Sequence, residues 1–143
     1  MNKYLKMKEK QRAELENFPI EFAFSKEQLK EAIKKLEVEK TSELLRVGPG
    51  GLIRKKDKEK FTNMIEKHEK EKQQAIEQDE TGEGFVKDMF RYELGNHEYI
   101  VTGRLNDTLD ALALTPEEVK ENEKLKNGLD QARKEYLKQY ETG

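Results

Sequence analysis

The residue types best suited to chemistry come together in one short segment, Asn96-His97-Glu98-Tyr99. The segment interrupts an apolar stretch from Phe85 to Thr115, whereas most of the chain is rich in Lys and Glu. A histidine can titrate near neutral pH and a neighbouring carboxylate can tune it, which is the minimum for acid–base catalysis. No nucleophile and no second carboxylate can be identified to complete such a site. A small enzyme based on His97 and Glu98 is therefore the least favoured interpretation.

The same four side chains can have a structural role, because they can satisfy the free backbone groups where an apolar helix ends. This structural interpretation is favoured over a functional one. As a functional site, the segment is expected to bind another macromolecule. The candidate binding residues are Asn96, His97, Glu98, Tyr99 and Arg104.

Metal ligation has little support in the spacing of the histidines. His97-Glu98 resembles the start of an HExxH motif, but Val101 stands where the second histidine would be. The other histidine, His68, lies on the apolar stripe of a predicted helix, and the chain has no cysteine. A site of one histidine with carboxylates would require the fold to bring Asp or Glu close to it. No metal and no cofactor are predicted.

A basic cluster supports an alternative function, nucleic-acid binding. Its members are Arg54, Lys55, Lys56, Lys58 and Lys60, and a second group near the N-terminus comprises Lys3, Lys6, Lys8, Lys10 and Arg12. Such side chains can contact a phosphate backbone, but lysines also protect the edge of a small sheet from pairing. Dedicated nucleic-acid binders usually have a basic surplus, whereas 28 basic and 30 acidic residues give this chain a net charge of −2. Nucleic-acid binding therefore remains an alternative that is less favoured than protein binding.

The elements that must position these residues are mostly helical. Helices are predicted at 3–16, from the Ser25 N-cap to about 36, at 58–78, at 85–94, near 108–112, and from the Thr115 capping box to the C-terminal region. A strand is predicted at 20–24, and runs at 44–47 and 52–54 flank Gly48-Pro49-Gly50-Gly51 as a β-hairpin. The expected fold class is α+β, a mostly helical single domain with a small antiparallel sheet of about three strands.

Glycines and polar residues are expected to set the helix ends. Gln28 has the spacing to reach back to the Ser25 amide, and Asp57 is a suitable N-cap for the helix at 58–78. Gly95 is the expected C′ residue of the helix at 85–94. Asn127-Gly128 is a candidate break in the C-terminal helix, because an interior Gly costs about 1 kcal/mol relative to Ala.

The length of 143 residues suits one domain, 1–143. Its parts are an N-terminal helix (3–16), a small sheet with helices (20–78), a linker at 79–84 and a helical half (85–141). The chain is 34% apolar and 41% charged, which is typical of helices with narrow apolar stripes and broad solvated faces. The N-terminus lacks the apolar region of a secretory signal, and no stretch approaches a membrane span. A cytoplasmic protein with no membrane partner is expected.

Three segments resemble a known group of proteins. They are FAFS at 22–25, GPGGLIRKKD at 48–57 and DMFRYELGNHEYIVTGRLNDTLDALALT at 88–115. The chain is similar, over about residues 3–135, to a group of small uncharacterised proteins from phages and mobile elements of low-GC Gram-positive bacteria. That group has no assigned activity, so the resemblance implies only a setting, an accessory protein inside a bacterial cell.

The sequence does not determine a function. The preferred hypothesis is a non-enzymatic accessory or interaction protein whose partner is another protein or a second copy of the chain. It rests on the missing catalytic motifs and on the charge-rich helical composition.

Overall fold

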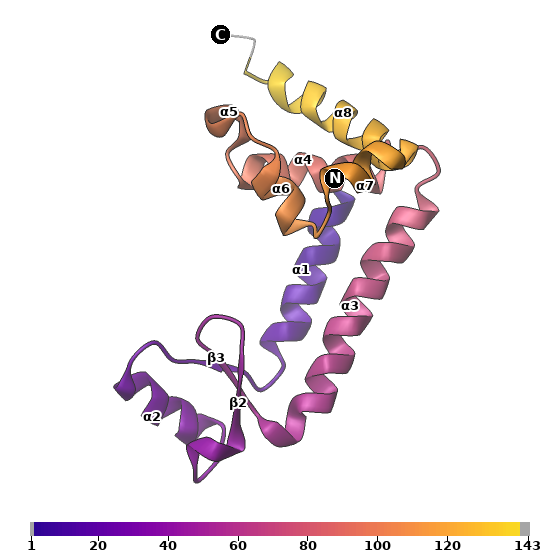
Figure 1. Ribbon diagram of the computed structural model, residues 1–143. Coiled ribbons are helices and arrows are strands. Elements are labelled where there is room, and N and C mark those ends of the chain that lie inside the picture. Colours follow the sequence, from indigo (N-terminus) through magenta and orange to yellow (C-terminus); the bar gives the residue numbers. More distant parts are fainter. Residues whose placement is uncertain (1, 141–143) are drawn as a thin grey trace. The chain divides into compact units, whose positions relative to one another are not determined.

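The computed structural model of the protein describes residues 2–140 (Figure 1). Residue 141, the last of the predicted helical half, lies outside this range. The chain forms two compact units: unit 1 comprises residues up to Glu9 and from Lys72 onward, and unit 2 comprises Lys10–Glu71. Both boundaries fall within helices, α1 (Lys3–Glu16) and α3 (Lys58–Gln78). The expectation of a single domain stays a prediction.

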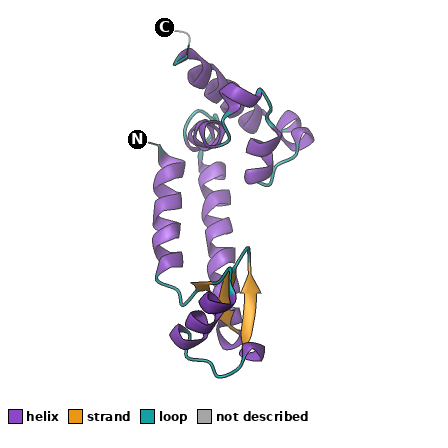
Figure 2. Ribbon diagram, turned by 90° about the vertical axis from the view of Figure 1, so that its left-hand side faces the viewer, coloured by secondary structure: helices purple, strands orange, loops and turns teal. Residues whose placement is uncertain are grey.

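Unit 2 contains the sheet. Its strands are β1 (Glu21–Phe22), β2 (Leu44–Val47) and β3 (Gly51–Arg54), in the antiparallel order β1-β3-β2 (Figure 2). Leu45 faces Ile53 across the hairpin, and the turn places Gly48 and Gly50 at positive φ of 64° and 72°. Glycine adopts this conformation without the steric cost that other residues meet. The predicted hairpin and three-stranded sheet are confirmed, although β1 is shorter than the run 20–24.

Helix α2 (Lys26–Lys35) completes unit 2 together with parts of α1 and α3. Ser25 is its N-cap, and the Ser25 hydroxyl accepts from the amide of Gln28 at 3.2 Å. The Gln28 side chain accepts instead from the amide of Phe24, at 2.7 Å, so the reach back to Ser25 was a wrong prediction. Asp57 ends a 3-10 turn (Lys55–Asp57), and its carboxylate accepts from Arg54 Nε at 2.7 Å. A preceding 3-10 turn, Thr41–Glu43, leads into β2.

Unit 1 is helical. Its elements after α3 are α4 (Phe85–Asn96), α5 (Tyr99–Thr102), α6 (Asn106–Ala111), α7 (Pro116–Glu121) and α8 (Glu123–Lys138). Helices α4 and α8 pack closely against each other (Figure 1). The core is assembled from apolar side chains of all these helices and the start of α1, among them Tyr4, Val86, Met89, Phe90, Leu94, Leu109, Leu112, Leu129, Ala132 and Tyr136. The apolar stretch recognised in the sequence is therefore the centre of this core.

Two predicted helix ends lie elsewhere. Helix α4 continues through Gly95 to Asn96. The C-terminal region divides at Asn122, whose side chain accepts from the Leu125 amide at 3.1 Å and caps α8. Gly128 lies inside an unbroken α8 because its missing side chain makes room for Val86 of α4, which would lie 2.5 Å from a Cβ atom there. The expected break at Gly128 is wrong, whereas the Thr115 capping box is confirmed.

Across residues 2–140, no helix combines enough length with enough apolar character to cross a membrane.

Candidate functional site

The candidate segment joins α4 to α5 in unit 1. His97 lies just after the last residue of α4, and its Nε2 atom lies 3.2 Å from a carboxylate oxygen of Glu93. Glu93 precedes His97 by four residues, a spacing that places the two side chains on one face of a helix. The side chain of Glu93 is 2% exposed and that of His97 is 28% exposed. His97 therefore links a buried carboxylate to the surface.

Glu93 is the centre of a buried polar cluster. The hydroxyl of Tyr4 donates to its second carboxylate oxygen at 3.4 Å, and Lys8 Nζ lies 4.0 Å from that oxygen. Burial, followed by the negative charge of Glu93, raises the pKa of Tyr4 above its usual value. Thr108, which is fully buried, donates to the backbone carbonyl of Glu93 at 3.3 Å. Such a carboxylate is tolerated in a core because its oxygens have partners.

Tyr99 anchors the other end of the segment. It is 8% exposed, and its hydroxyl accepts from Arg133 Nη2 at 3.0 Å. The ring of Tyr136 lies 6.1 Å from the Tyr99 ring, and the Tyr136 hydroxyl accepts from the Ile100 amide at 3.3 Å. Desolvation by burial is the main cause that raises the pKa of Tyr136. The first turn of α5 is thus fastened to α8.

Helix α5 presents apolar side chains outward. Ile100 and Val101 are 43% and 77% exposed, although both are large and apolar. Two residues in left-handed conformation bound the helix, Glu98 at φ 51° and Gly103 at φ 66°. The exposed Tyr140 packs edge-to-face on Tyr136, with ring centroids 5.3 Å apart. We call Ile100, Val101 and Tyr140 the α5 surface.

The structure separates the sequence candidates into two groups. His97 lies within hydrogen-bond distance of the buried Glu93 and Tyr99 is itself buried, whereas Asn96, Glu98 and Arg104 are exposed. The side chain of His97 pairs with Glu93 rather than with Glu98. This arrangement supports an ordered surface segment that is attached to the core more directly than it supports acid–base catalysis by the adjacent residues His97 and Glu98.

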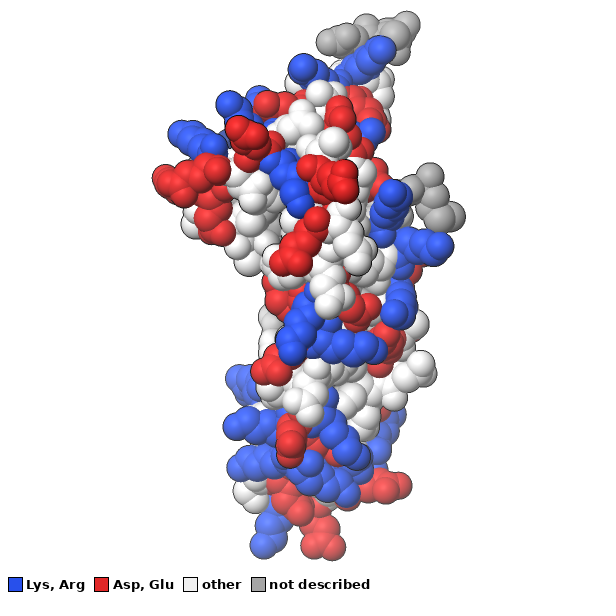
Figure 3. All heavy atoms as spheres, turned by 90° about the vertical axis from the view of Figure 1, so that its right-hand side faces the viewer, with Lys and Arg blue, Asp and Glu red and all other residues white. Residues whose placement is uncertain are grey.

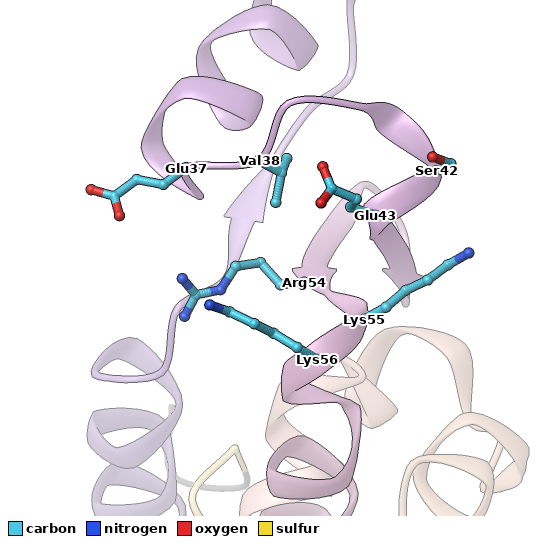
Figure 4. Close-up of a pocket in the computed structure, with 7 residues that line it drawn as sticks. All are labelled: Glu37, Val38, Ser42, Glu43, Arg54, Lys55 and Lys56. Atoms are coloured by element: carbon cyan, nitrogen blue, oxygen red, sulfur yellow. The ribbon is translucent and has the colours of Figure 1, made fainter.

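The basic cluster lies in unit 2. Arg54, Lys55 and Lys56 line a pocket of about 330 Å³, and its other lining residues are Glu37, Val38, Ser42 and Glu43 (Figure 4). Arg54 is paired with Asp57, whereas Lys55, Lys56, Lys58 and Lys60 are exposed. Basic and acidic groups are interspersed on the face shown in Figure 3. The cluster is therefore partly neutralised by acidic neighbours.

Comparison with protein families gives a match over most of the chain. The model of a family of unknown function, DUF7659, matches residues 3–135. The chain belongs to the DUF7659 family. Comparisons of the DUF7659 chain with curated proteins and with solved structures find no match. The family description assigns no activity, ligand or partner to these residues.

Glu93 of this DUF7659 chain was missed by sequence reasoning. The available signal was its i,i+4 spacing to His97 within the predicted apolar helix. That signal is weak, because charged residues are frequent in this sequence and most of them are exposed. The contact with Tyr4, 89 positions away, has no local signature at all.

Proposed function

We propose that this protein is a non-enzymatic accessory protein that binds another protein through the α5 surface. The observation that carries the proposal is the exposure of Ile100 and Val101 on a helix fastened to the core by Tyr99. Exposed apolar groups that gather on a fixed support are typical of interaction sites. The resemblance to phage and mobile-element proteins supports a place of action inside a bacterial cell.

The fixed support matters for affinity. Binding loses free energy when loops and side chains must be ordered on association, so a surface that is already ordered binds with a smaller loss. Tyr136 orders α5 through the Ile100 amide and orders Tyr140 through ring packing. A partner can therefore bury Ile100, Val101 and Tyr140 together, and aromatic residues often dominate the binding energy of such surfaces.

The exposed Asn96, Glu98 and Arg104 fit the polar border of the same surface. Protein interfaces usually surround an apolar centre with a polar and accessible rim. His97, with its buried partner, contributes mainly to the shape of the segment. This arrangement favours binding over catalysis, because Glu93, the carboxylate that pairs with His97, is only 2% exposed and is therefore hardly accessible to a substrate.

The test compares variants that change the α5 surface without touching its support. Val101→Asp and Ile100→Asp place a charge in the apolar centre, and Ala111→Asp places one on an exposed position of α6 in the same unit. Tagged proteins are used to capture partners from nuclease-treated bacterial lysate, followed by binding measurements with the purified partner. We expect both α5 variants, but not Ala111→Asp, to lose binding with unchanged circular dichroism.

Unchanged binding by both α5 variants would contradict the proposed surface. Analytical ultracentrifugation of the same variants distinguishes a second copy of the chain from a different partner. Loss of all capture after nuclease treatment would instead favour nucleic-acid binding. That alternative is supported by the exposed Lys55, Lys56, Lys58 and Lys60, and it requires an affinity that falls steeply with salt concentration.

A further inference from the structure

Three potential metal ligands meet in unit 2, outside the α5 surface. Glu14 of α1 and His68 and Glu71 of α3 each offer a ligand atom, and these atoms all lie within 4.8 Å of one another. His68 Nε2 is 2.9 Å from Glu14 Oε2. The side chains of Glu14, His68 and Glu71 are only 27%, 13% and 23% exposed. The fold thus supplies the neighbouring carboxylates that the spacing around His68 did not reveal.

The separations suit a small divalent cation. Zinc binds imidazole nitrogen and carboxylate oxygen at about 2.0–2.2 Å in a tetrahedral arrangement, so two of its ligand atoms lie about 3.3–3.6 Å apart. Ligand atoms that lie up to 4.8 Å apart would have to approach by no more than about 1.5 Å, whereas His68 Nε2 and Glu14 Oε2, now 2.9 Å apart, would have to separate slightly. Ion binding would therefore require side-chain rotations of the two glutamates.

Glu71 provides an independent observation. Its Oε1 atom is buried and has no hydrogen-bond partner, while its other oxygen, Oε2, lies 3.3 Å from Lys10 Nζ. A buried carboxylate oxygen without a partner is costly, because burial removes its hydration. A cation shared with His68 and Glu14 would remove this cost.

The local charges are compatible with such a cation. Lys67 Nζ lies 3.6 Å from Glu14 Oε2, and Lys10 pairs with Glu71. Both lysine side chains are more than half exposed and can move into solvent when a metal takes their place.

We propose that Glu14, His68 and Glu71 form a binding site for a first-row divalent transition metal such as Zn²⁺. An imidazole nitrogen favours these metals over Mg²⁺ and Ca²⁺, which prefer oxygen ligands only. The ion would join α1 to α3 within unit 2 and leave a coordination position for water or a fourth ligand.

Titration calorimetry of the full chain, without a polyhistidine tag, tests the site with Zn²⁺ and Co²⁺, and with Mg²⁺ as the control ion. We expect one Zn²⁺ per chain, a Co²⁺ absorption spectrum that reports nitrogen and oxygen ligands, and no Mg²⁺ binding at equal concentration. Glu71→Gln and Glu14→Gln keep the side-chain shape, and each should weaken Zn²⁺ binding by about tenfold or more. His68→Ala should abolish it.

Two control variants match these changes. His97→Ala removes the only other histidine, and Glu66→Gln removes an exposed carboxylate from the same helix. Both should leave Zn²⁺ affinity unchanged. Absence of Zn²⁺ and Co²⁺ binding, loss of binding in His97→Ala, or full affinity in Glu71→Gln would each overturn the proposal. The isosteric Glu71→Gln variant keeps the test decisive if His68→Ala fails to fold.

Discussion

At the scale of single residues, Glu93 determines how the candidate segment is built. One carboxylate in the core of unit 1 interacts with Tyr4, Lys8 and His97, and so joins α1, α4 and the start of the candidate segment. A buried group of this kind stabilises a fold only while its partners remain in place, because a donor or acceptor left alone retains its desolvation cost.

We therefore expect Glu93→Ala to destabilise the protein by about 2–4 kcal/mol, since it leaves a cavity and removes the acceptor of the Tyr4 hydroxyl. Urea unfolding monitored by tyrosine fluorescence measures the change. Glu80→Ala, at an exposed position in the loop before α4, is the matched control and should change stability little. Equal stabilities for the two variants would show that the buried cluster contributes nothing.

Glu43 gives a pH dependence at the same scale. Its carboxylate accepts from the amides of Lys40 and Glu39 at 3.0 Å and 2.9 Å, and these bonds lower its pKa below the usual 4.5. The unfolded chain then binds the proton more tightly than the folded chain does. The stabilising effect is therefore complete above pH 4.5 and is lost as the pH falls through the lower pKa of the folded state.

The variant Glu43→Gln tests this dependence. The wild type should be more stable than the variant at neutral pH, and the difference should shrink as the pH falls below 4.5. Urea unfolding over this range measures both proteins. A difference that stays constant with pH would contradict the role of the charged carboxylate.

At the scale of elements, two glycines show why helix ends were hard to predict. Gly95 and Gly128 were both expected to end or interrupt a helix, because glycine is common at the position where a helix ends. Both lie inside helices, for different reasons. A Cβ on Gly95 would meet nothing nearer than 3.9 Å, whereas one on Gly128 would lie 2.5 Å from Val86 Cγ1 and 2.7 Å from the Gly82 carbonyl oxygen.

These surroundings predict opposite effects of the same substitution. Gly128→Ala should destabilise the protein by about 1–3 kcal/mol because it forces α4 and α8 apart. Gly95→Ala should stabilise it by about 0.5–1 kcal/mol through helix propensity alone. Thermal and urea unfolding of the pair check the signs, and a stabilising Gly128→Ala would show that the close approach of the helices is not needed.

Local chemistry accounts for the parts of the fold that the sequence predicted correctly. The hairpin at Gly48–Gly51 and the caps at Ser25 and Thr115 depend on residues a few positions apart. The missed features depend on residues that are far apart in the sequence. Tyr4 donates a hydrogen bond to Glu93, and Glu14 contacts His68, which is 54 positions later. Helix α5 escaped prediction because four residues are too few to show a helical period.

At the scale of the whole molecule, α1 and α3 each run unbroken through residues that belong to both units. Helix formation is cooperative, because each added residue extends an existing series of backbone hydrogen bonds. Unfolding of one unit should therefore disrupt helical turns that the other unit uses. We expect the two units to unfold in a single transition, as the sequence-based expectation of one domain requires.

The distribution of aromatic residues allows a direct test. All five tyrosines, Tyr4, Tyr92, Tyr99, Tyr136 and Tyr140, belong to unit 1, and the chain has no tryptophan. Phe18→Trp places a separate probe in unit 2, against the ring of Phe61 at 5.6 Å. We expect one urea midpoint from three signals: tyrosine emission of the wild type, tryptophan emission of the variant, and far-ultraviolet circular dichroism of both proteins. The comparison is made after correction for any change in stability that the substitution causes. Separate midpoints for the tyrosine and tryptophan signals, with circular dichroism changing in two steps, would contradict this expectation. Each unit would then be a domain of its own, because α1 and α3 could fray at Glu9 and Lys72 without unfolding the rest.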